Sequence, residues 1–270
     1  MTAYICKTCG VQHAESPRPP VACKICQDER QYVPREGQRW STLSELAGEG
    51  HRSEIRDLEP GLTGIGAQPK VAIGQRALLL QTAHGNFLWD CLGFIDERAT
   101  TAVRERGGLA GIAISHPHFY GVCVEWSRAF GGIPIYIPEA DRDWVMRSDQ
   151  AIRYWRDRVE PLPGVTVIQC GGHFEGSAVL HWEAGAEGRG ALLTGDSITV
   201  VSDRRFVSFM RSYPNQIPLP PGLVRGIVEA VRPYRFERVY GGWWESVVES
   251  DAMTAIERSA ERYIAWISRP

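Results

Sequence analysis

Residues 108–121 read GLAGIAISHPHFYG, an apolar run that ends at two histidines separated by one proline. If this run stays extended, side chains two residues apart point to the same side, so His116 and His118 converge on one ion. Pro117 favours this geometry, because a residue before proline is biased toward extended backbone. A polar loop after a buried strand can carry the same pair, so the pair alone does not establish a metal site.

Two later stretches place further ligands after apolar strands. Residues 170–177 (CGGHFEGS) put His173 in a glycine-rich turn, and residues 192–197 (LLTGDS) put Asp196 directly after a strand. Loops that follow strands meet at one edge of an open α/β sheet, where such folds place their sites. We therefore expect one metal centre, formed by His116, His118, His173 and Asp196.

The N-terminal segment contains a second metal motif, made of two Cys-x-x-Cys units thirteen residues apart: Cys6, Cys9, Cys23 and Cys26. Four thiolates brought together by two tight turns suit a tetrahedral zinc ion better than a redox pair or two disulfides. Such a closed site leaves no open coordination position, so this zinc is expected to be structural. We interpret residues 1–35 as a rubredoxin-like zinc ribbon, and Cys91, Cys123 and Cys170 as reduced core residues.

Composition narrows the classes of partner. The 270-residue chain has 30 basic and 32 acidic residues, a net charge of −2, and no basic stripe. Nucleic-acid and anionic-membrane surfaces both need such a stripe, so a small-molecule substrate is the expected partner. The chain shows neither a signal-peptide pattern nor a long apolar run, which favours a cytoplasmic location. A homo-oligomer is left open.

The pattern of short apolar runs and glycines predicts a layered α/β fold. Residues 36–64 are expected to connect the ribbon, with a short helix near 41–48, to a catalytic domain over 65–270. Strands are expected at 71–73, 77–81, 86–89, 112–115, 133–137, 165–170, 178–182 and 191–194. Helices are expected at 121–130, 139–146, 151–159, 222–231 and 250–267.

Four motifs in this order resemble the metallo-β-lactamase fold: L-W-D at 88–90, S-H-x-H at 115–118, G-H-x-x-G-S at 172–177 and T-G-D at 194–196. The resemblance implies a four-layer αββα sandwich with metal bound at one edge, between the two sheets. His116, His118 and His173 would be the three-histidine site, and Asp196 the carboxylate beside a second metal. Asp90 would support the site without binding metal.

The chain departs from the pattern of that family where the second metal binds. The full motif is H-x-H-x-D-H, but Tyr120 stands where the aspartate belongs and Gly121 where the third histidine belongs. A late histidine is also missing from residues 238–244 (RVYGGWW). These departures predict a single catalytic metal.

One zinc ion on three imidazoles lowers the pKa of a bound water to about 7 and so supplies hydroxide for hydrolysis. Asp196 would orient that water or act as general base. Tyr120 would donate to an oxyanion unless it only packs beside Phe119, and His84 is either a site residue or a turn residue. We expect a hydrolase of a lactone, ester, thioester, amide or isothiocyanate.

Two other functions fit the same residues. Two imidazoles and Asp196 could hold Fe(II) in a mononuclear non-heme oxygenase of sulfur-containing substrates. Alternatively, the reduced ligand set marks a decayed site in a non-catalytic binding protein. Several aromatic or sulfur-containing side chains follow the metal motifs and could form either an apolar substrate wall or part of the core. They are Phe206, Phe209, Met210, Tyr213, Trp243 and Trp244.

Overall fold

Strand β5 (Ala77–Thr82) shows how the sequence builds two layers of core. Side chains alternate between the faces of a strand. Leu78 and Leu80 pack toward the opposing sheet, whereas Ala77 and Leu79 pack under the outer layer of helices. Because both faces are apolar, the strand lies in the interior of a layered structure.

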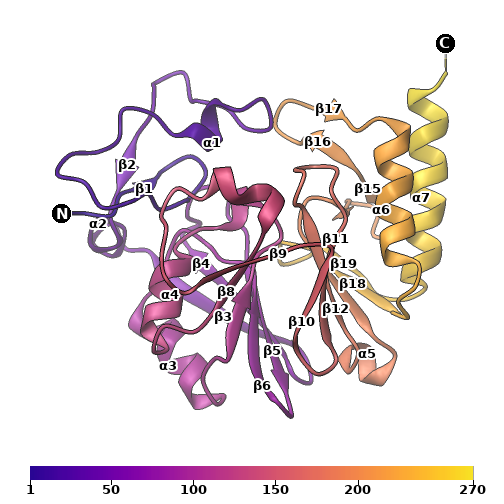
Figure 1. Ribbon diagram of the computed structural model, residues 1–270, viewed down its shortest axis with the longest axis horizontal. Helices are drawn as coiled ribbons and strands as arrows, with labels where there is room; N and C mark the ends of the chain where they lie inside the picture. The colour runs from indigo at the N-terminus through magenta and orange to yellow at the C-terminus, as the bar shows by residue number, and fades with distance from the viewer. Residues whose placement is uncertain (270) are drawn as a thin grey trace.

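The computed structural model describes residues 1–269 (Figure 1). Its first sheet has seven strands in the order β3-β4-β5-β6-β7-β8-β9. The first four strands pair antiparallel and the rest pair parallel. The other six strands of this sheet are β3 (Arg52–Glu59), β4 (Leu62–Gln68), β6 (Gly85–Trp89), β7 (Gly111–Ala113), β8 (Ile135–Pro138) and β9 (Ile152–Trp155). Helices of this half are α3 (Glu97–Glu105), α4 (Cys123–Ala129) and the 3₁₀ turns η1 (Pro117–Phe119) and η2 (Glu139–Trp144).

The second sheet has six strands in the order β10-β11-β12-β13-β18-β19, and α6 and α7 cover its outer face. The strands are β10 (Arg158–Leu162), β11 (Val165–Gln169), β12 (Ala178–Trp182), β13 (Ala191–Thr194), β18 (Arg238–Tyr240) and β19 (Val247–Val248). The helices are α5 (Gly185–Gly188), α6 (Pro221–Val231) and α7 (Ala252–Ile267). Two short hairpins join β14 (Thr199–Val200) to β15 (Val207–Ser208), and β16 (Met210–Ser212) to β17 (Ile217–Pro218).

The N-terminal ribbon lies across one end of this sandwich, with α1 close to the β16–β17 hairpin (Figure 1). Its elements are β1 (Ile5–Cys6), α1 (Lys24–Gln27), β2 (Trp40–Ser41) and α2 (Leu43–Gly48). Together with the two sheets and the outer helices, this confirms the predicted four-layer αββα sandwich preceded by a ribbon. Within residues 1–269, no helix combines the length and apolar character needed to cross a membrane.

Three local predictions are wrong, and one helix, α3, was not predicted. The segment predicted to connect the domains, 36–64, contains β3, a partly exposed, charge-rich edge strand that lacks an apolar alternation. Residues 151–159 form β9 and the start of β10 instead of a helix, because Ile152 to Trp155 pair in parallel with β8. Residues 71–73 form a turn, and α3 was missed because only its Ala99, Thr100 and Val103 are buried.

Candidate metal centre

Three histidine rings and one carboxylate meet at the edge between the two sheets. His116 follows β7 in extended conformation, as expected, but η1 begins at Pro117, so His118 reaches the centre from a 3₁₀ turn and not from a strand. His173 comes from the glycine-rich loop after β11, and Asp196 from the end of β13. The ring centroids lie 4.9–5.1 Å apart in all three histidine pairs.

The four side chains point one atom each at a common position. His118 Nδ1 lies 3.2 Å from His173 Nε2, and Asp196 Oδ2 lies 3.5 Å from His116 Nε2 and 3.7 Å from His173 Nε2. A tetrahedral zinc ion bound at about 2.0 Å separates its ligands by about 3.3 Å. The buried Nε2 of His116 has no hydrogen-bond partner among the described residues. The donor set therefore fits one small metal ion.

Backbone and hydroxyl groups hold the rings on their far sides. His173 Nδ1 donates to the carbonyl oxygen of Met210 at 3.0 Å. Since a carbonyl only accepts, this bond places the ring proton on Nδ1 and leaves the lone pair of Nε2 for a metal. His116 Nδ1 lies 2.9 Å from Ser115 Oγ. Each of these two contacts orients an imidazole toward the centre.

The electrostatics of the centre also suit a divalent cation. Burial lowers the pKa of His173 to about 4 and the pKa of His118 well below its ordinary value. Burial raises the pKa of Asp196, but the facing imidazoles of His116 and His173 outweigh it, and the net pKa lies below its ordinary value. Neutral imidazoles and one carboxylate are the protonation states that metal binding requires.

Neighbouring residues fix the loops that carry the ligands. Asp90, in left-handed conformation with φ of 64°, accepts the Ser115 N–H at 2.7 Å, so it supports the start of the His116 segment. Gly195 packs so tightly that a Cβ there would lie 2.3 Å from Ser115 Oγ. The residue before Asp196 therefore has to be glycine.

Asp141, in η2, supports the loop that carries His173, and sequence reasoning missed it. Its Oδ1 accepts the Gly176 N–H at 2.8 Å, and a Cβ on Gly176 would lie 2.6 Å from the Asp141 Cγ. Burial raises the pKa of this fully buried carboxyl to about 7. Its sequence context, EADRDW, resembles a solvated charged turn and offers no signal for this role.

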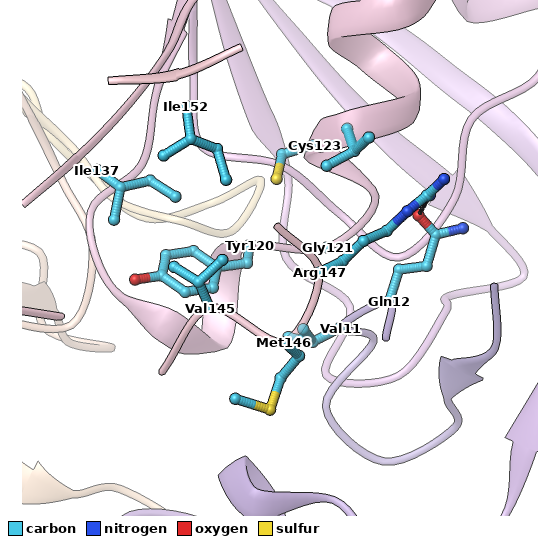
Figure 2. A pocket seen from close by; sticks show the side chains of 11 residues that line it. Val11, Gln12, Tyr120, Gly121, Cys123, Ile137, Val145, Met146, Arg147 and Ile152 are labelled. Carbon is cyan, nitrogen blue, oxygen red and sulfur yellow. Dashed lines mark hydrogen bonds between the residues drawn. The ribbon is translucent and has the colours of Figure 1, made fainter. Parts of the chain in front are cut away.

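The structure does not bring Tyr120 or His84 to the centre, and both assignments as catalytic residues are corrected. Tyr120 lines a small cavity of about 10 Å³ with Ile137 and Val145 (Figure 2). Its hydroxyl donates to the Asp141 carbonyl oxygen at 3.4 Å. His84 is exposed in the β5–β6 turn. The length of β6 puts that turn about 20 Å from Asp90.

The predicted departure from a two-metal site has a steric basis. Gly121 has φ of 48°, and a Cβ there would lie 2.2 Å from the carbonyl oxygen of Leu92. No histidine can replace it without moving the backbone. The ring of Phe119 packs on His116 at a centroid distance of 4.5 Å, and Trp243 packs on Phe119 at 5.9 Å.

Most of the aromatic candidates for a substrate wall pack elsewhere. Trp244 lies against Arg56, and Phe206 lies under Arg262. Phe209 is completely buried against α7. Tyr213 lies at the centre: its ring centroid is 6.1 Å from that of His173, and its hydroxyl donates to the Asp196 carbonyl oxygen at 3.1 Å. Trp243 lies one ring further out, on Phe119.

The four cysteines of the ribbon also converge. The Cys6 and Cys26 sulfurs lie 3.5 Å apart, and the Cys9 and Cys23 sulfurs 3.7 Å apart. Tetrahedral thiolates on zinc at about 2.3 Å would be about 3.8 Å apart. The Gln38 side-chain amide and the Cys9 N–H point at the Cys6 sulfur. This geometry supports the predicted closed zinc site.

Comparison with known proteins identifies the family. No family model matches the chain. The uncharacterized protein YmaE of Bacillus subtilis (strain 168) is 47% identical over 266 residues, covering 98% of this chain and 96% of YmaE. The chain belongs to the YmaE family. The match spans the ribbon as well as the sandwich, so both parts are shared within the YmaE family.

Solved structures show the fold of this YmaE-family chain to be the metallo-β-lactamase fold. VMB-1 at pH 5.5 matches with a TM-score of 0.61 and 12% identity, over 80% of this chain and 99% of its own. DIM-1 exposed to ceftazidime matches with a TM-score of 0.60 and 12% identity, over 80% and 98%. FIM-1 from Pseudomonas aeruginosa in the mono-zinc form matches with a TM-score of 0.56 and 13% identity, over 78% and 95%.

Proposed function

We propose that the chain is a metal-dependent hydrolase that uses a single zinc ion. The observation that carries the proposal is the convergence of four ligand atoms, one each from His116, His118, His173 and Asp196, at separations that fit one ion. Steric exclusion of a histidine side chain at Gly121 supports a single ion. Zinc held by the three imidazoles would keep its fourth position for a water and so supply a metal-bound hydroxide near neutral pH, with the Asp196 carboxylate beside that position.

Asp196 is the residue of this chain suited to handle the proton of the nucleophile. Its Oδ2 faces the two Nε2 atoms, whereas its Oδ1 is buried and has no hydrogen-bond partner among the described residues. Tyr213 holds the Asp196 backbone by its hydrogen bond. Asp196 Oδ1 is therefore free to orient a water and to accept its proton.

The burial of the ligands restricts the substrate. Asp196 is 6% exposed and the three histidines 2% or less, so the centre leaves little room for a large substrate. We propose a small electrophile, a lactone, ester, thioester, amide or isothiocyanate, as substrate. A small-molecule partner without nucleic acid or membrane, and a cytoplasmic location, stay predictions from the sequence, and a homo-oligomer stays open.

Metal analysis of the purified full chain tests the proposal. We expect two ions per chain, one in the ribbon and one at the histidines, and hydrolysis of at least one of the five substrate classes. His118→Ala should lose one ion and at least 100-fold in activity. His84→Ala, which removes an exposed histidine, should keep both ions and full activity. Three bound ions, or full activity in His118→Ala, would refute the single-zinc mechanism.

The ligand set also favours one second candidate. Asp196 Oδ2 lies within 3.7 Å of the Nε2 atoms of His116 and His173, so these three residues could present two imidazoles and one carboxylate to Fe(II). The chain would then be an oxygenase of sulfur-containing substrates. Iron at this site in protein purified without oxygen, together with oxygen uptake on a thiol substrate, would favour this function over hydrolysis. A chain that keeps the ribbon ion alone would be a binding protein.

A further inference from the structure

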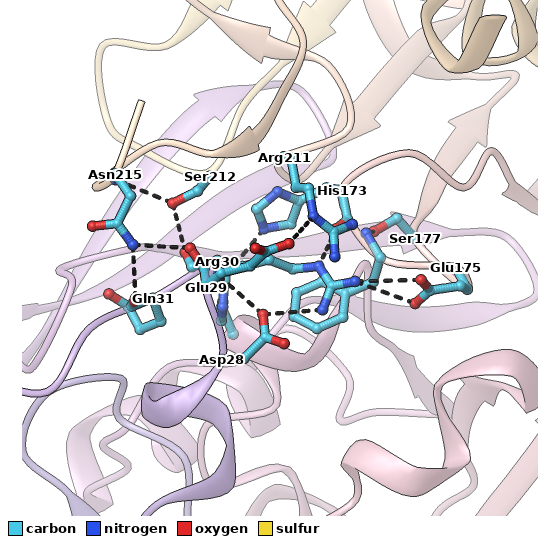
Figure 3. Close-up of polar contacts among 12 residues, drawn as sticks. Asp28, Glu29, Arg30, Gln31, His173, Glu175, Ser177, Arg211, Ser212 and Asn215 are labelled. Carbon is cyan, nitrogen blue, oxygen red and sulfur yellow. Dashed lines mark hydrogen bonds and ion pairs between the residues drawn. The ribbon is translucent and has the colours of Figure 1, made fainter. Parts of the chain in front are cut away.

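A loop of the ribbon reaches the centre directly. Helix α1 carries Cys26, and residues 28–31 follow it. Within this loop Arg30 is 3% exposed, although charged residues are seldom buried without a specific partner. Figure 3 shows its guanidinium lying among the residues that surround His173. The second Cys-x-x-Cys unit of the ribbon therefore leads within four residues to a buried cation beside a metal ligand.

Arg30 contacts three successive residues, 173–175, of the glycine-rich loop that carries His173 (residues 170–177, the ligand loop). Its Nε donates to the His173 carbonyl oxygen at 2.7 Å, and its Nη2 lies 3.3 Å from a carboxylate oxygen of Glu175. The guanidinium carbon lies 4.1 Å from the centroid of the Phe174 ring. Asp28, from the ribbon, accepts from Nη1 at 3.0 Å and orients the group.

The ligand loop needs this external support. Gly171 and Gly172, just before His173, have φ of 66° and 88°, so flexible backbone precedes the ligand. The ring of His173 is held by Met210 in β16, and its carbonyl by Arg30. One ligand is thus fixed from two sides, by the sandwich and by the ribbon.

The sandwich in turn holds the ribbon loop in place. Ser212 Oγ donates to the Arg30 carbonyl oxygen at 3.1 Å. Asn215 Nδ2 donates to the carbonyl oxygens of Glu29 and Gln31 at 2.8 and 2.9 Å. Arg211 pairs with Glu29 at the exposed rim (Figure 3). Arg30 is therefore anchored at its own backbone and cannot follow the ligand loop freely.

We propose that Arg30 is a positioning residue for His173, through which the zinc ribbon sets the metal affinity of the histidine centre. This inference rests on the proposed metal centre. Arg30 touches no ligand atom of the ion, so it acts by fixing the backbone of His173. Outer-sphere partners of metal ligands contribute about 10- to 100-fold in metal affinity, and we expect a loss of that size without Arg30.

Metal titration of full-chain variants tests the proposal. Arg30→Gln and Arg211→Gln are compared after selective removal of the ion at the histidine centre. Arg211→Gln is the matched control, because Arg211 pairs with Glu29 at the same interface but does not contact His173. Competition with a chromophoric chelator measures zinc affinity, and the visible spectrum of bound Co²⁺ reports ligand geometry. We expect Arg30→Gln to bind 10- to 100-fold more weakly with an altered Co²⁺ spectrum, and Arg211→Gln to stay within about twofold of wild type.

A conservative variant separates positioning from folding. Arg30→Lys keeps one donor for the His173 carbonyl but cannot also reach Asp28 and Glu175, so its loss should lie between wild type and Arg30→Gln. Equal affinity in Arg30→Gln and wild type, or an equal loss in Arg211→Gln, would overturn the inference. If Arg30→Gln loses the ribbon zinc, Arg30→Lys takes its place in the comparison with Arg211→Gln. Equal zinc affinity of the histidine centre in Arg30→Lys and Arg211→Gln would then overturn the inference. A wild-type chain without a second ion would overturn the proposed function itself.

Discussion

Replacing Asp141 by asparagine should remove a pH dependence from the stability of this protein. The Asp141 carboxyl is buried, and burial raises its pKa from 3.8 to about 7. Asparagine keeps an oxygen to accept the Gly176 N–H and resembles the protonated acid. The variant therefore behaves like a chain whose residue 141 never ionises.

The sign and size of the effect follow from proton linkage. The folded chain keeps the Asp141 proton up to about pH 7, whereas the unfolded chain releases it near 3.8. The protonated Asp141 carboxyl therefore makes its full contribution to the free energy of unfolding below pH 3.8, and this contribution is lost as the pH rises to about 7. Over about three pKa units, the loss reaches roughly 4 kcal/mol in the free energy of unfolding, as an upper bound.

Urea unfolding at pH 5.0 to 8.0 measures this effect. The difference in free energy of unfolding between Asp141→Asn and wild type should grow with pH in favour of the variant. Titrations of other groups common to both chains cancel in that difference. Asp143→Asn, an exposed neighbour on η2, is the control and should show no trend. A difference for Asp141→Asn that is constant from pH 5.0 to 8.0 would refute the reasoning.

Two further predictions concern glycines of the centre. Gly195→Ala should lose the histidine-site ion but keep the ribbon zinc, because the new Cβ would displace Ser115 beside His116. Metal analysis checks this prediction. Gly222→Ala is the control, because a Cβ at Gly222 meets no other atom within 4 Å. Gly121→His should add no third ion and should lower the melting temperature, because its Cβ would overlap the Leu92 carbonyl. A third bound ion in a stable Gly121→His chain would contradict the steric argument.

Local motifs explain why the centre could be predicted from the sequence. His116, His173 and Asp196 each follow an apolar strand, and strand ends of one sheet edge meet in space. His118 was predicted correctly as a neighbour of His116 but for the wrong local reason, since a 3₁₀ turn and not an extended strand carries it. The signal for the ribbon site lies in still shorter stretches of sequence, because the two cysteines of each Cys-x-x-Cys unit are three positions apart.

The supporting residues could not be predicted because their partners are distant in sequence. Arg30 lies 143 positions from His173, and Asp141 lies 35 positions from Gly176. Nothing in their immediate context distinguishes them from surface charges. The error at β3 has a related cause: an edge strand exposes charged side chains, and its identity depends on pairing with β4.

The docking of the ribbon on the ligand loop also bears on the order of assembly. The four cysteines lie within the first 26 residues, so the ribbon can take up zinc before residues 116–196 have been synthesised. Its anchoring hairpin, β16–β17, is made later still. The ribbon can therefore fold before the sandwich, but its docking has to wait for the β16–β17 hairpin. Because Arg30 reaches the His173 carbonyl oxygen only in the docked arrangement, the histidine centre would be complete as a binding site only after docking, which makes metal loading an event of maturation.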